Sequence, residues 1–308
     1  MTIFIDNNYV YITKDYLKIV LSCLGAAIVE IKYGDDYLTM TPKSYNELDR
    51  EDIYYGKTIG PIANRVKDGL IVINSKNYYL DLNEGCVSNH SGKDGLSNVL
   101  FDVETKNDKV IFTHQGNQFG GQITYKVIYS FPSDGEIKIE YEVAPSTDAI
   151  ISLTNHTFFN LGEPNINNLS LIVPSDEFIE SDKDTLVPLC FKPIIPCLDF
   201  NKEKAIIKDL NDPYLINHKT NGYDHCFLLA KDSVVLKSPK YILEVESDYQ
   251  CCHIYSDNYP DRVITKNSDA LYRRAVAIEM VDDYLNRPVV LKDQIYHRYI
   301  IYKFSLNR

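Results

Sequence analysis

The sequence lacks the features of several large classes of protein. Helical periodicity is scarce, and the best candidate, "PKSYNELDRED" at 42–52, is short. The longest apolar stretch, at 19–31, contains Glu30 and is too short to span a bilayer. Residues 1–10 have no basic segment followed by an apolar run, so we expect no signal peptide and no membrane association.

Positive charge and metal-binding patterns are also missing. The net charge is -11, which argues against a nucleic-acid or anionic-membrane surface and suits a neutral or cationic small ligand. The 7 cysteines form no C-x-x-C pair and no cluster with zinc-ligand spacing. We therefore expect free thiols, a reducing compartment and a cytoplasmic protein. The adjacent Cys251 and Cys252 would point to opposite faces of a strand, so we expect no redox or metal pair there.

Alternation of apolar and polar residues is what the sequence does have. It runs through "QITYKVIYSF" (122–131), "IKIEYEVAP" (137–145), "KYILEVESD" (240–248) and "YHRYIIYKFSL" (296–306). The 24 tyrosines favour half-buried strands, and turn signals such as "PSDGE" separate the runs. Strands without alternating helices predict an all-β fold, a large antiparallel β-sandwich with few short helices. We expect a single domain over residues 1–308.

Two polar loops need an explanation. Asn64 and Arg65 follow Gly60 in "IGPIANRVKDG", and the guanidinium fork of Arg65 suits adjacent oxygens of a ligand, although a solvated loop arginine is the more common explanation. His90 lies in the Gly-rich "CVSNHSGKDG", where loop histidines are often merely exposed.

Three further polar residues lie in strand-like segments. His156 stands in "ISLTNHTFFNL" and could be a core histidine satisfied by its neighbours. Asp224 precedes His225 at the entry to an apolar strand, where it could simply cap a turn, and on a strand the two would face opposite ways. Glu279 lies among apolar residues in "RRAVAIEMVDDYL", and a buried carboxylate tends to be protonated unless a cation or hydrogen bonds keep it charged.

Taken in order, these segments resemble the aldose 1-epimerase, or galactose mutarotase, family. "GKTIGPIANR" matches the family's G-x-x-x-G-x-x-A-N-R, "VSNHSG" loosely its N-x-L-H-G-G loop, "TNHTFFNL" its T-N-H-x-Y-F-N-L, and "GYDH" is identical. "AIEM" partly matches L-E-x-Q, while "LDF" and "HIYSDN" resemble F-D-F and Q-x-Y-T-x-N. The resemblance covers about residues 16 to 304.

The resemblance implies a galactose mutarotase-like supersandwich that binds a small aldose sugar without metal or cofactor, as a monomer or homodimer. It implies that Glu279 is the general base and His156 the general acid. The pair would act on opposite sides of a sugar, opening the ring by taking the proton of the C1 hydroxyl and protonating the ring oxygen. The implied sugar-binding residues are Asn64, Arg65, His90, Phe158, Asp224 and His253.

Several positions depart from the family pattern. Phe158 replaces a frequent tyrosine, Ser91 a glycine, Pro61 an arginine and His253 a glutamine, and no glutamine follows Glu279. These changes leave the acid and base in place, and they put the preferred sugar in doubt more than the reaction.

Other functions remain open from the residues alone. A hexose-6-phosphate 1-epimerase would need cations for the phosphate, and Arg273 and Arg274 are the candidates. A glycoside hydrolase could use Asp224 and Glu279 as paired carboxylates, but the coupled His156 argues against it. A non-catalytic sugar-binding protein on the same fold would be expected to lack Glu279 or His156, and both are present.

Overall fold

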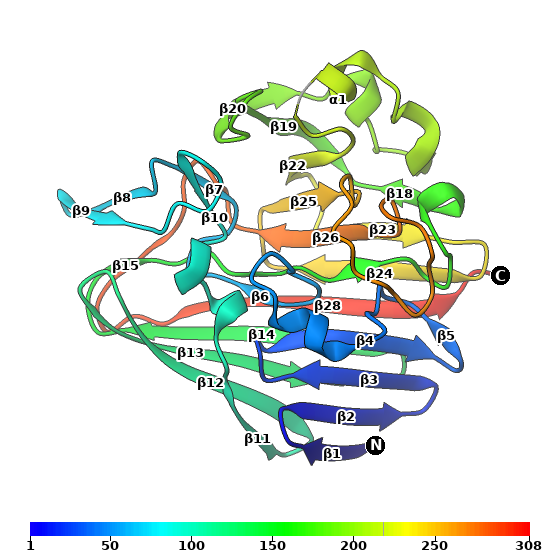
Figure 1. The fold of residues 1–308 in the computed structure, drawn as a ribbon, viewed down its shortest axis with the longest axis horizontal. Coiled ribbons are helices and arrows are strands. Elements are labelled where there is room, and N and C mark those ends of the chain that lie inside the picture. Colours follow the sequence, from blue (N-terminus) through cyan, green and yellow to red (C-terminus); the bar gives the residue numbers. More distant parts are fainter. Residues whose placement is uncertain (218) are drawn as a thin grey trace.

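The computed structural model describes residues 1–217 and 219–308, and over these residues antiparallel sheets make up most of the fold (Figure 1). The largest sheet has nine strands and contains all four of the alternating segments named above. In sheet order its strands are β11 (Asp102–Lys106), β12 (Lys109–Gln118), β13 (Gly121–Ser130), β14 (Glu136–Pro145), β28 (Tyr296–Leu306), β24 (Tyr241–Ser247), β23 (Ser233–Lys237), β18 (Ser170–Ile172) and β21 (Lys204–Ala205).

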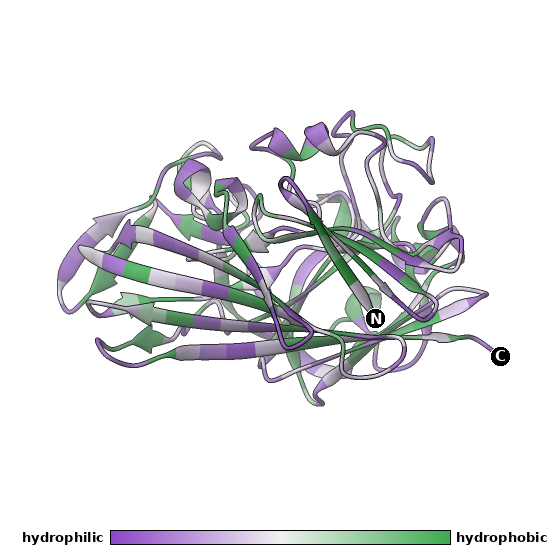
Figure 2. Cartoon of the chain, turned by 90° about the horizontal axis from the view of Figure 1, so that it is seen from below, coloured by the Kyte–Doolittle hydropathy of each residue, from purple (hydrophilic) through white to green (hydrophobic). Residues whose placement is uncertain are grey.

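Alternation along these strands decides which face is buried. In β14, Ile137, Ile139, Tyr141 and Val143 are fully buried, while the intervening Lys138 is partly exposed. Figure 2 shows hydrophobic and hydrophilic residues alternating along the strands. The expected facing of this segment is confirmed.

Two further sheets pack on the nine-stranded one. The five-stranded sheet is β1 (Thr2–Asp6), β2 (Tyr9–Lys14), β3 (Leu17–Ser22), β4 (Ala27–Tyr33) and β5 (Asp36–Tyr37). The six-stranded sheet is β17 (Phe158–Phe159), β26 (Val276–Val281), β25 (Cys251–Tyr255), β22 (Asp224–Leu229), β19 (Ser175–Ser181) and β20 (Pro188–Pro193).

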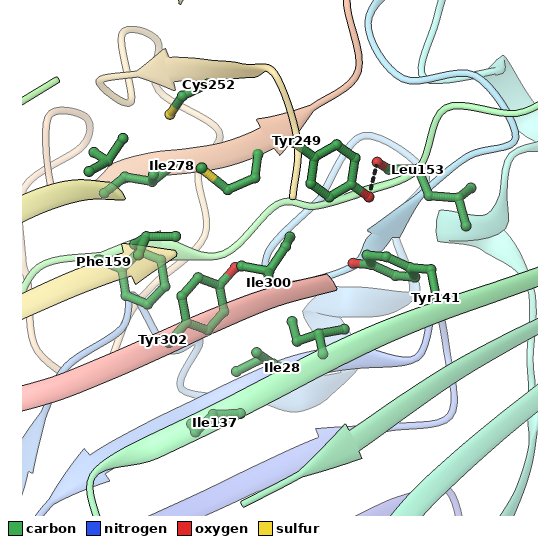
Figure 3. Close-up of a cluster of buried hydrophobic side chains, with 14 of the residues drawn as sticks. Ile28, Ile137, Tyr141, Leu153, Phe159, Tyr249, Cys252, Ile278, Ile300 and Tyr302 are labelled. Carbon is green, nitrogen blue, oxygen red and sulfur yellow. Dashed lines mark hydrogen bonds between the residues drawn. The ribbon is translucent and has the colours of Figure 1, made fainter. Parts of the chain in front are cut away.

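One hydrophobic core joins the three sheets. Figure 3 shows Ile28 of β4 near Tyr302 and Ile137 of the large sheet, and Ile278 of β26 belongs to the same buried cluster. Several core tyrosines place their hydroxyls on acceptors: Tyr249 Oη, for example, donates to the carbonyl of Leu153 at 2.8 Å. The sandwich predicted from the sequence is confirmed.

Short elements fill the edges. The paired strands are β6 (Thr58–Ile59) with β16 (Thr154–Asn155), β7 (Arg65–Lys67) with β10 (Val87–Asn89), β8 (Leu70–Ile73) with β9 (Lys76–Tyr79), and β15 (Ala149–Ile150) with β27 (Val289–Val290). The helices are α1 (Pro213–Asn217) and the 3-10 turns η1 (Tyr45–Asp49), η2 (Gly92–Asp94), η3 (Leu96–Asn98), η4 (Ile166–Asn168), η5 (Pro196–Leu198) and η6 (Ile206–Asp209).

The helix candidate at 42–52 therefore forms only the short turn η1, in which Leu48 is the buried residue. Within the described part of the chain, no helix has the length and apolar character needed to cross a bilayer.

Candidate active site

Three neighbouring strands of the six-stranded sheet place polar side chains on one face. In β26, Ile278 and Met280 enter the main core, so Glu279 between them faces the other way. His253 of β25 stands directly opposite Glu279 in the strand pairing, and Asp224 of β22 lies beside it. The side-chain period of two thus explains how residues far apart in sequence meet.

The segment that carries His156 runs beside β26, where Phe158 and Phe159 of β17 pair with Ala277 and Val276. Its backbone pairs with Gly56 and Lys57: Gly56 N donates to His156 O at 2.9 Å, and His156 N to Lys57 O at 3.0 Å. A glycine is required at position 56 because φ is +63° and a Cβ atom would lie 1.7 Å from the carbonyl oxygen of Ile28. Asn155 adds a hydrogen bond from its side chain to Gly56 O at 2.8 Å.

Two residues with left-handed backbone conformation, Asn64 and His90, form another side of the site. Asn64 has φ of 62° and His90 has φ of 55°, and each donates its backbone N–H to the other, to His90 Nδ1 and to Asn64 O, both at 3.3 Å. Non-glycine residues are uncommon in this region of φ, and they concentrate at functional sites.

These walls enclose a cavity of about 800 Å³. All eight site residues predicted from the sequence line it, although they span positions 64 to 279. They are Asn64, Arg65, His90, His156, Phe158, Asp224, His253 and Glu279.

The proposed acid and base lie side by side. His156 Nε2 is 3.4 Å from Glu279 Oε1, and the residues are 6% and 2% exposed. Neither His156 Nδ1 nor Glu279 Oε2 has a hydrogen-bond partner among residues 1–217 and 219–308, although both atoms are buried. The two groups are thus in contact with each other, because the pairing of Phe158 with Ala277 brings His156 alongside Glu279.

Arg65 joins two carboxylates at the cavity wall. Its Nε donates to Glu84 Oε2 at 2.8 Å, and its terminal nitrogen lies 3.6 Å from Asp224 Oδ2. Burial by itself would raise the pKa of Asp224, but the charge of Arg65 and the hydrogen bond from His253 hold that pKa well below its usual range. Asp224 is therefore ionised and accepts hydrogen bonds.

His90 is held neutral. Burial, together with the charges of His156 and Arg65, lowers the pKa of His90 well below its usual value. Its Nδ1 accepts the backbone N–H of Asn64, so the proton of the neutral ring is on Nε2. His90 can thus donate one hydrogen bond without adding charge.

Sequence reasoning missed Tyr54 and Glu84, which also line the cavity. The ring centroid of Tyr54 is 4.8 Å from that of His90 and 5.7 Å from that of His156, and burial raises the pKa of Tyr54 to about 12. Glu84 fixes Arg65. Both lie in loops outside the quoted motifs, and their spacing gives no signal of a role.

The two candidate phosphate-binding arginines are engaged elsewhere. Arg274 is 1% exposed and ion-paired with Asp257 and Asp261, each at 2.8 Å. Arg273 donates to the backbone of Asn221 at 2.7 Å. Neither lines the cavity, although Arg274 lies directly behind the lining residues Tyr55, Asp257 and Asp261. In the described ranges, no group of three or more His, Cys, Asp or Glu side chains is arranged to hold a metal ion.

Comparison with known proteins decides the family. The family model described as aldose 1-epimerase matches residues 9–303. The chain belongs to the aldose 1-epimerase family. This confirms the resemblance read from the motifs and the enzyme class expected with it, an isomerase.

Individual relatives agree with this assignment. Galactose mutarotase of Bos taurus is 25% identical, with 95% of this chain and 92% of the relative aligned, and that of Homo sapiens is 27% identical over 84% and 80%. Among solved structures, galactose 1-epimerase from Lactobacillus acidophilus NCFM superposes with a TM-score of 0.88 at 20% identity, covering 100% of this chain and 98% of that one. A GalM/aldose epimerase homologue from C. elegans gives a TM-score of 0.83 at 22% identity, covering 97% and 99%. These likenesses confirm the fold.

Proposed function

We propose that this enzyme interconverts the α- and β-anomers of a neutral free aldohexose such as galactose or glucose, with Glu279 as general base and His156 as general acid. The observation that carries the proposal is the buried His156–Glu279 pair, 3.4 Å apart, with unpartnered polar atoms on both residues within the described chain. The C1 hydroxyl and the ring oxygen of an aldopyranose are bonded to the same carbon, so adjacent acid and base groups suit them.

The reaction follows from these two groups. Glu279 takes the proton of the C1 hydroxyl as the bond between C1 and the ring oxygen breaks, and His156 gives a proton to that oxygen. The open aldehyde rotates about the C1–C2 bond. Closure reverses both transfers: the ring oxygen returns its proton to His156 and attacks the other face of C1, while the C1 oxygen recovers a proton from Glu279.

The remaining cavity residues would hold the ring. Arg65 and neutral His90 offer donors to hydroxyls, and ionised Asp224 offers an acceptor. Asn64, Phe158 and His253 complete the walls. Holding a small sugar in one orientation against the acid and base is the contribution of these residues to the rate.

Charge argues against the alternatives. Among residues 1–217 and 219–308, the cavity is lined by two cationic residues, Arg65 and Lys219, and by seven carboxylates, two of which pair with Arg274 behind the wall. The seven belong to Asp52, Glu84, Asp184, Asp224, Asp257, Asp261 and Glu279. Such a wall repels a phosphosugar. A glycoside hydrolase acting through Asp224 is disfavoured because that carboxyl, with its lowered pKa, is a poor general acid.

We further propose that residues 1–308 act as one catalytic domain, in the cytoplasm, as a monomer or homodimer. A core that includes residues from Val10 to Phe304 supports the single domain, and free thiols at all seven cysteines support a reducing compartment.

Polarimetry tests the reaction. Freshly dissolved α-galactose, α-glucose and their 6-phosphates are followed with and without the protein, and the double variant Glu279→Gln/His156→Asn serves as the matched control. We expect faster mutarotation of the free hexoses than with the double variant, and a smaller effect on the phosphates. Equal rates for the protein and the double variant on every free aldose would overturn the proposal.

A further inference from the structure

His253 lies between the proposed base and a proposed sugar-binding carboxylate, on the face of the sheet that forms the cavity. It is 6% exposed and stands in β25, opposite Glu279 on one side and Cys226 on the other. Its Nε2 is 2.6 Å from Asp224 Oδ1, and its Nδ1 is 3.4 Å from Asn64 Nδ2. Both ring nitrogens therefore contact protein groups.

The hydrogen bonds around Asn64 fix where the proton of His253 is. The backbone N–H of Arg65 donates to Asn64 Oδ1 at 2.5 Å, so the side-chain amide nitrogen of Asn64 faces His253. An amide nitrogen only donates, so His253 Nδ1 is the acceptor and carries no proton. The proton of the ring is then on Nε2, which donates to Asp224.

We propose that His253 is a positioning residue: as a neutral ring with its proton on Nε2, it fixes the carboxylate of Asp224 for the sugar and does not itself bind the sugar. This inference rests on the proposed function, since it assigns His253 a role at the same site. It changes the expectation that His253 contacts the sugar directly, because both of its nitrogens are already engaged.

A second proton on His253 would disturb this arrangement. Protonated Nδ1 cannot accept from Asn64, and the ring would become a cation close to Arg65. The other titratable groups around it are Asp224 and Cys226 of β22, Glu279 of β26, His90 on the loop after β10 and Tyr284, whose ring centroid is 5.9 Å away. Sugar binding should therefore weaken when His253 is protonated.

The proton position can be measured without any activity. Long-range ¹⁵N–¹H correlation spectra of the ¹⁵N-histidine-labelled protein report the tautomer of each imidazole, and the spectrum of His253→Gln identifies the signals of residue 253. We expect a protonated Nε2 and a bare Nδ1 at neutral pH. A proton on Nδ1 in place of Nε2 would overturn the proposal, whatever the reaction proves to be.

Kinetics test the positioning role. Glutamine can also accept from Asn64 and donate to Asp224, whereas alanine and asparagine are too short to span the two. We expect His253→Ala and His253→Asn to raise KM about tenfold, the scale of one lost hydrogen bond to a charged group, with kcat changing less than KM. His253→Gln should recover most of the loss. His114→Gln, in β12 and outside the cavity, is the matched control.

The outcomes separate the two proposals. If no free aldose is mutarotated by the parent protein, the proposed function fails, and the tautomer measurement still tests the geometry. If the parent is active but the folded Ala and Asn variants keep its KM, or if Gln is no better than Ala, the positioning role is wrong. The Asn variant keeps more side-chain volume and serves if the Ala variant does not fold.

Discussion

Two buried charged clusters lie in the wall of the same cavity, and they differ in whether their polar atoms have partners. In the Arg274 cluster, made of Arg274, Asp257, Asp261 and Tyr55, the guanidinium donates to both carboxylates, to Tyr55 Oη and to the carbonyl of Val263. In the His156 cluster, made of His156 and Glu279, each residue keeps one buried polar atom without a partner in the described chain.

This difference distinguishes a cluster that stabilises the fold from one that can react with a ligand. A buried cation with all of its hydrogen bonds made by protein has nothing left for a ligand, so the Arg274 cluster holds the loop at 257–263 against Tyr55. Buried polar atoms without partners cost free energy and are rare in folded proteins. The two atoms of the His156 cluster lie on an acid and a base that line the cavity, so they can form hydrogen bonds with a ligand there.

Replacing Arg274 should cause the largest loss of stability. Arg274→Met leaves Asp257 and Asp261 buried without their cation, and we expect a fall of about 3–5 kcal/mol in the free energy of unfolding, measured by urea denaturation. Arg273→Met is the matched control, because the Arg273 guanidinium donates to a backbone carbonyl and has no ion-pair partner among the described residues, and it should cost no more than about 0.5 kcal/mol. Equal effects of the two substitutions would remove the distinction between the clusters.

Replacing His156 should affect the rate and spare the fold. His156→Asn removes the proton donor, and we expect kcat to fall by about 10²-fold with little change in the melting temperature. His114→Asn, outside the cavity, should keep the parent kcat. A folded His156→Asn protein with the parent kcat would show that another group protonates the ring oxygen.

Replacing Arg65 should affect binding more than rate. Lysine keeps the charge but loses the planar fork that reaches Glu84 and Asp224, so Arg65→Lys should raise KM about tenfold. Arg298→Lys changes an arginine paired with Asp282 outside the cavity, and its KM should match that of the parent. Indistinguishable KM values for the two variants would exclude Arg65 from sugar binding.

Lys57 extends the comparison to a buried cation without an ion-pair partner among residues 1–217 and 219–308. Its Nζ donates only to Arg50 O at 3.4 Å, and burial lowers the pKa of Lys57 from 10.5 to about 8. Below pH 8 the folded protein carries a costly charge, so Lys57→Met should raise the free energy of unfolding by about 1–3 kcal/mol at pH 7.

The sign of the pH dependence follows from proton binding. Between about pH 8 and pH 10.5 the unfolded chain binds more protons at Lys57 than the folded protein does, so the parent gains stability relative to the variant as pH rises. The advantage of Lys57→Met should therefore shrink from pH 7 to pH 10. Urea denaturation at both pH values measures the difference in the free energy of unfolding between Lys57→Met and the parent. A difference that stays constant or grows from pH 7 to pH 10 would contradict the lowered pKa of Lys57.

The strands could be predicted from sequence because one face of each is buried. Alternation in the segment 137–145 correctly predicted that Ile137 and Tyr141 are buried, because side chains on a strand alternate between two faces and the apolar set must face the core. The segment at 42–52 was less predictable: its helical pattern is short, and only η1 (Tyr45–Asp49) forms.

The site was predictable only as far as the family motifs reach. The resemblance named eight residues that line one cavity, but it could not give the 3.4 Å contact between His156 and Glu279, which depends on the pairing of β17 with β26. Tyr54 and Glu84 lie in loops and join the site through contacts with residues distant in sequence: Tyr54 with His156, and Glu84 with Arg65. Arg274 looked available for phosphate because sequence alone does not reveal that Asp257 and Asp261 surround it.

The central claim is that Glu279 is the base of a ring-opening reaction, and one measurement tests it most directly. Glu279→Gln keeps the shape of the side chain and removes the proton acceptor, so kcat for α-galactose and α-glucose, followed by polarimetry, should fall by about 10²-fold or more while the thermal melt stays close to that of the parent. A folded Glu279→Gln protein that mutarotates both sugars at the parent rate would contradict the account.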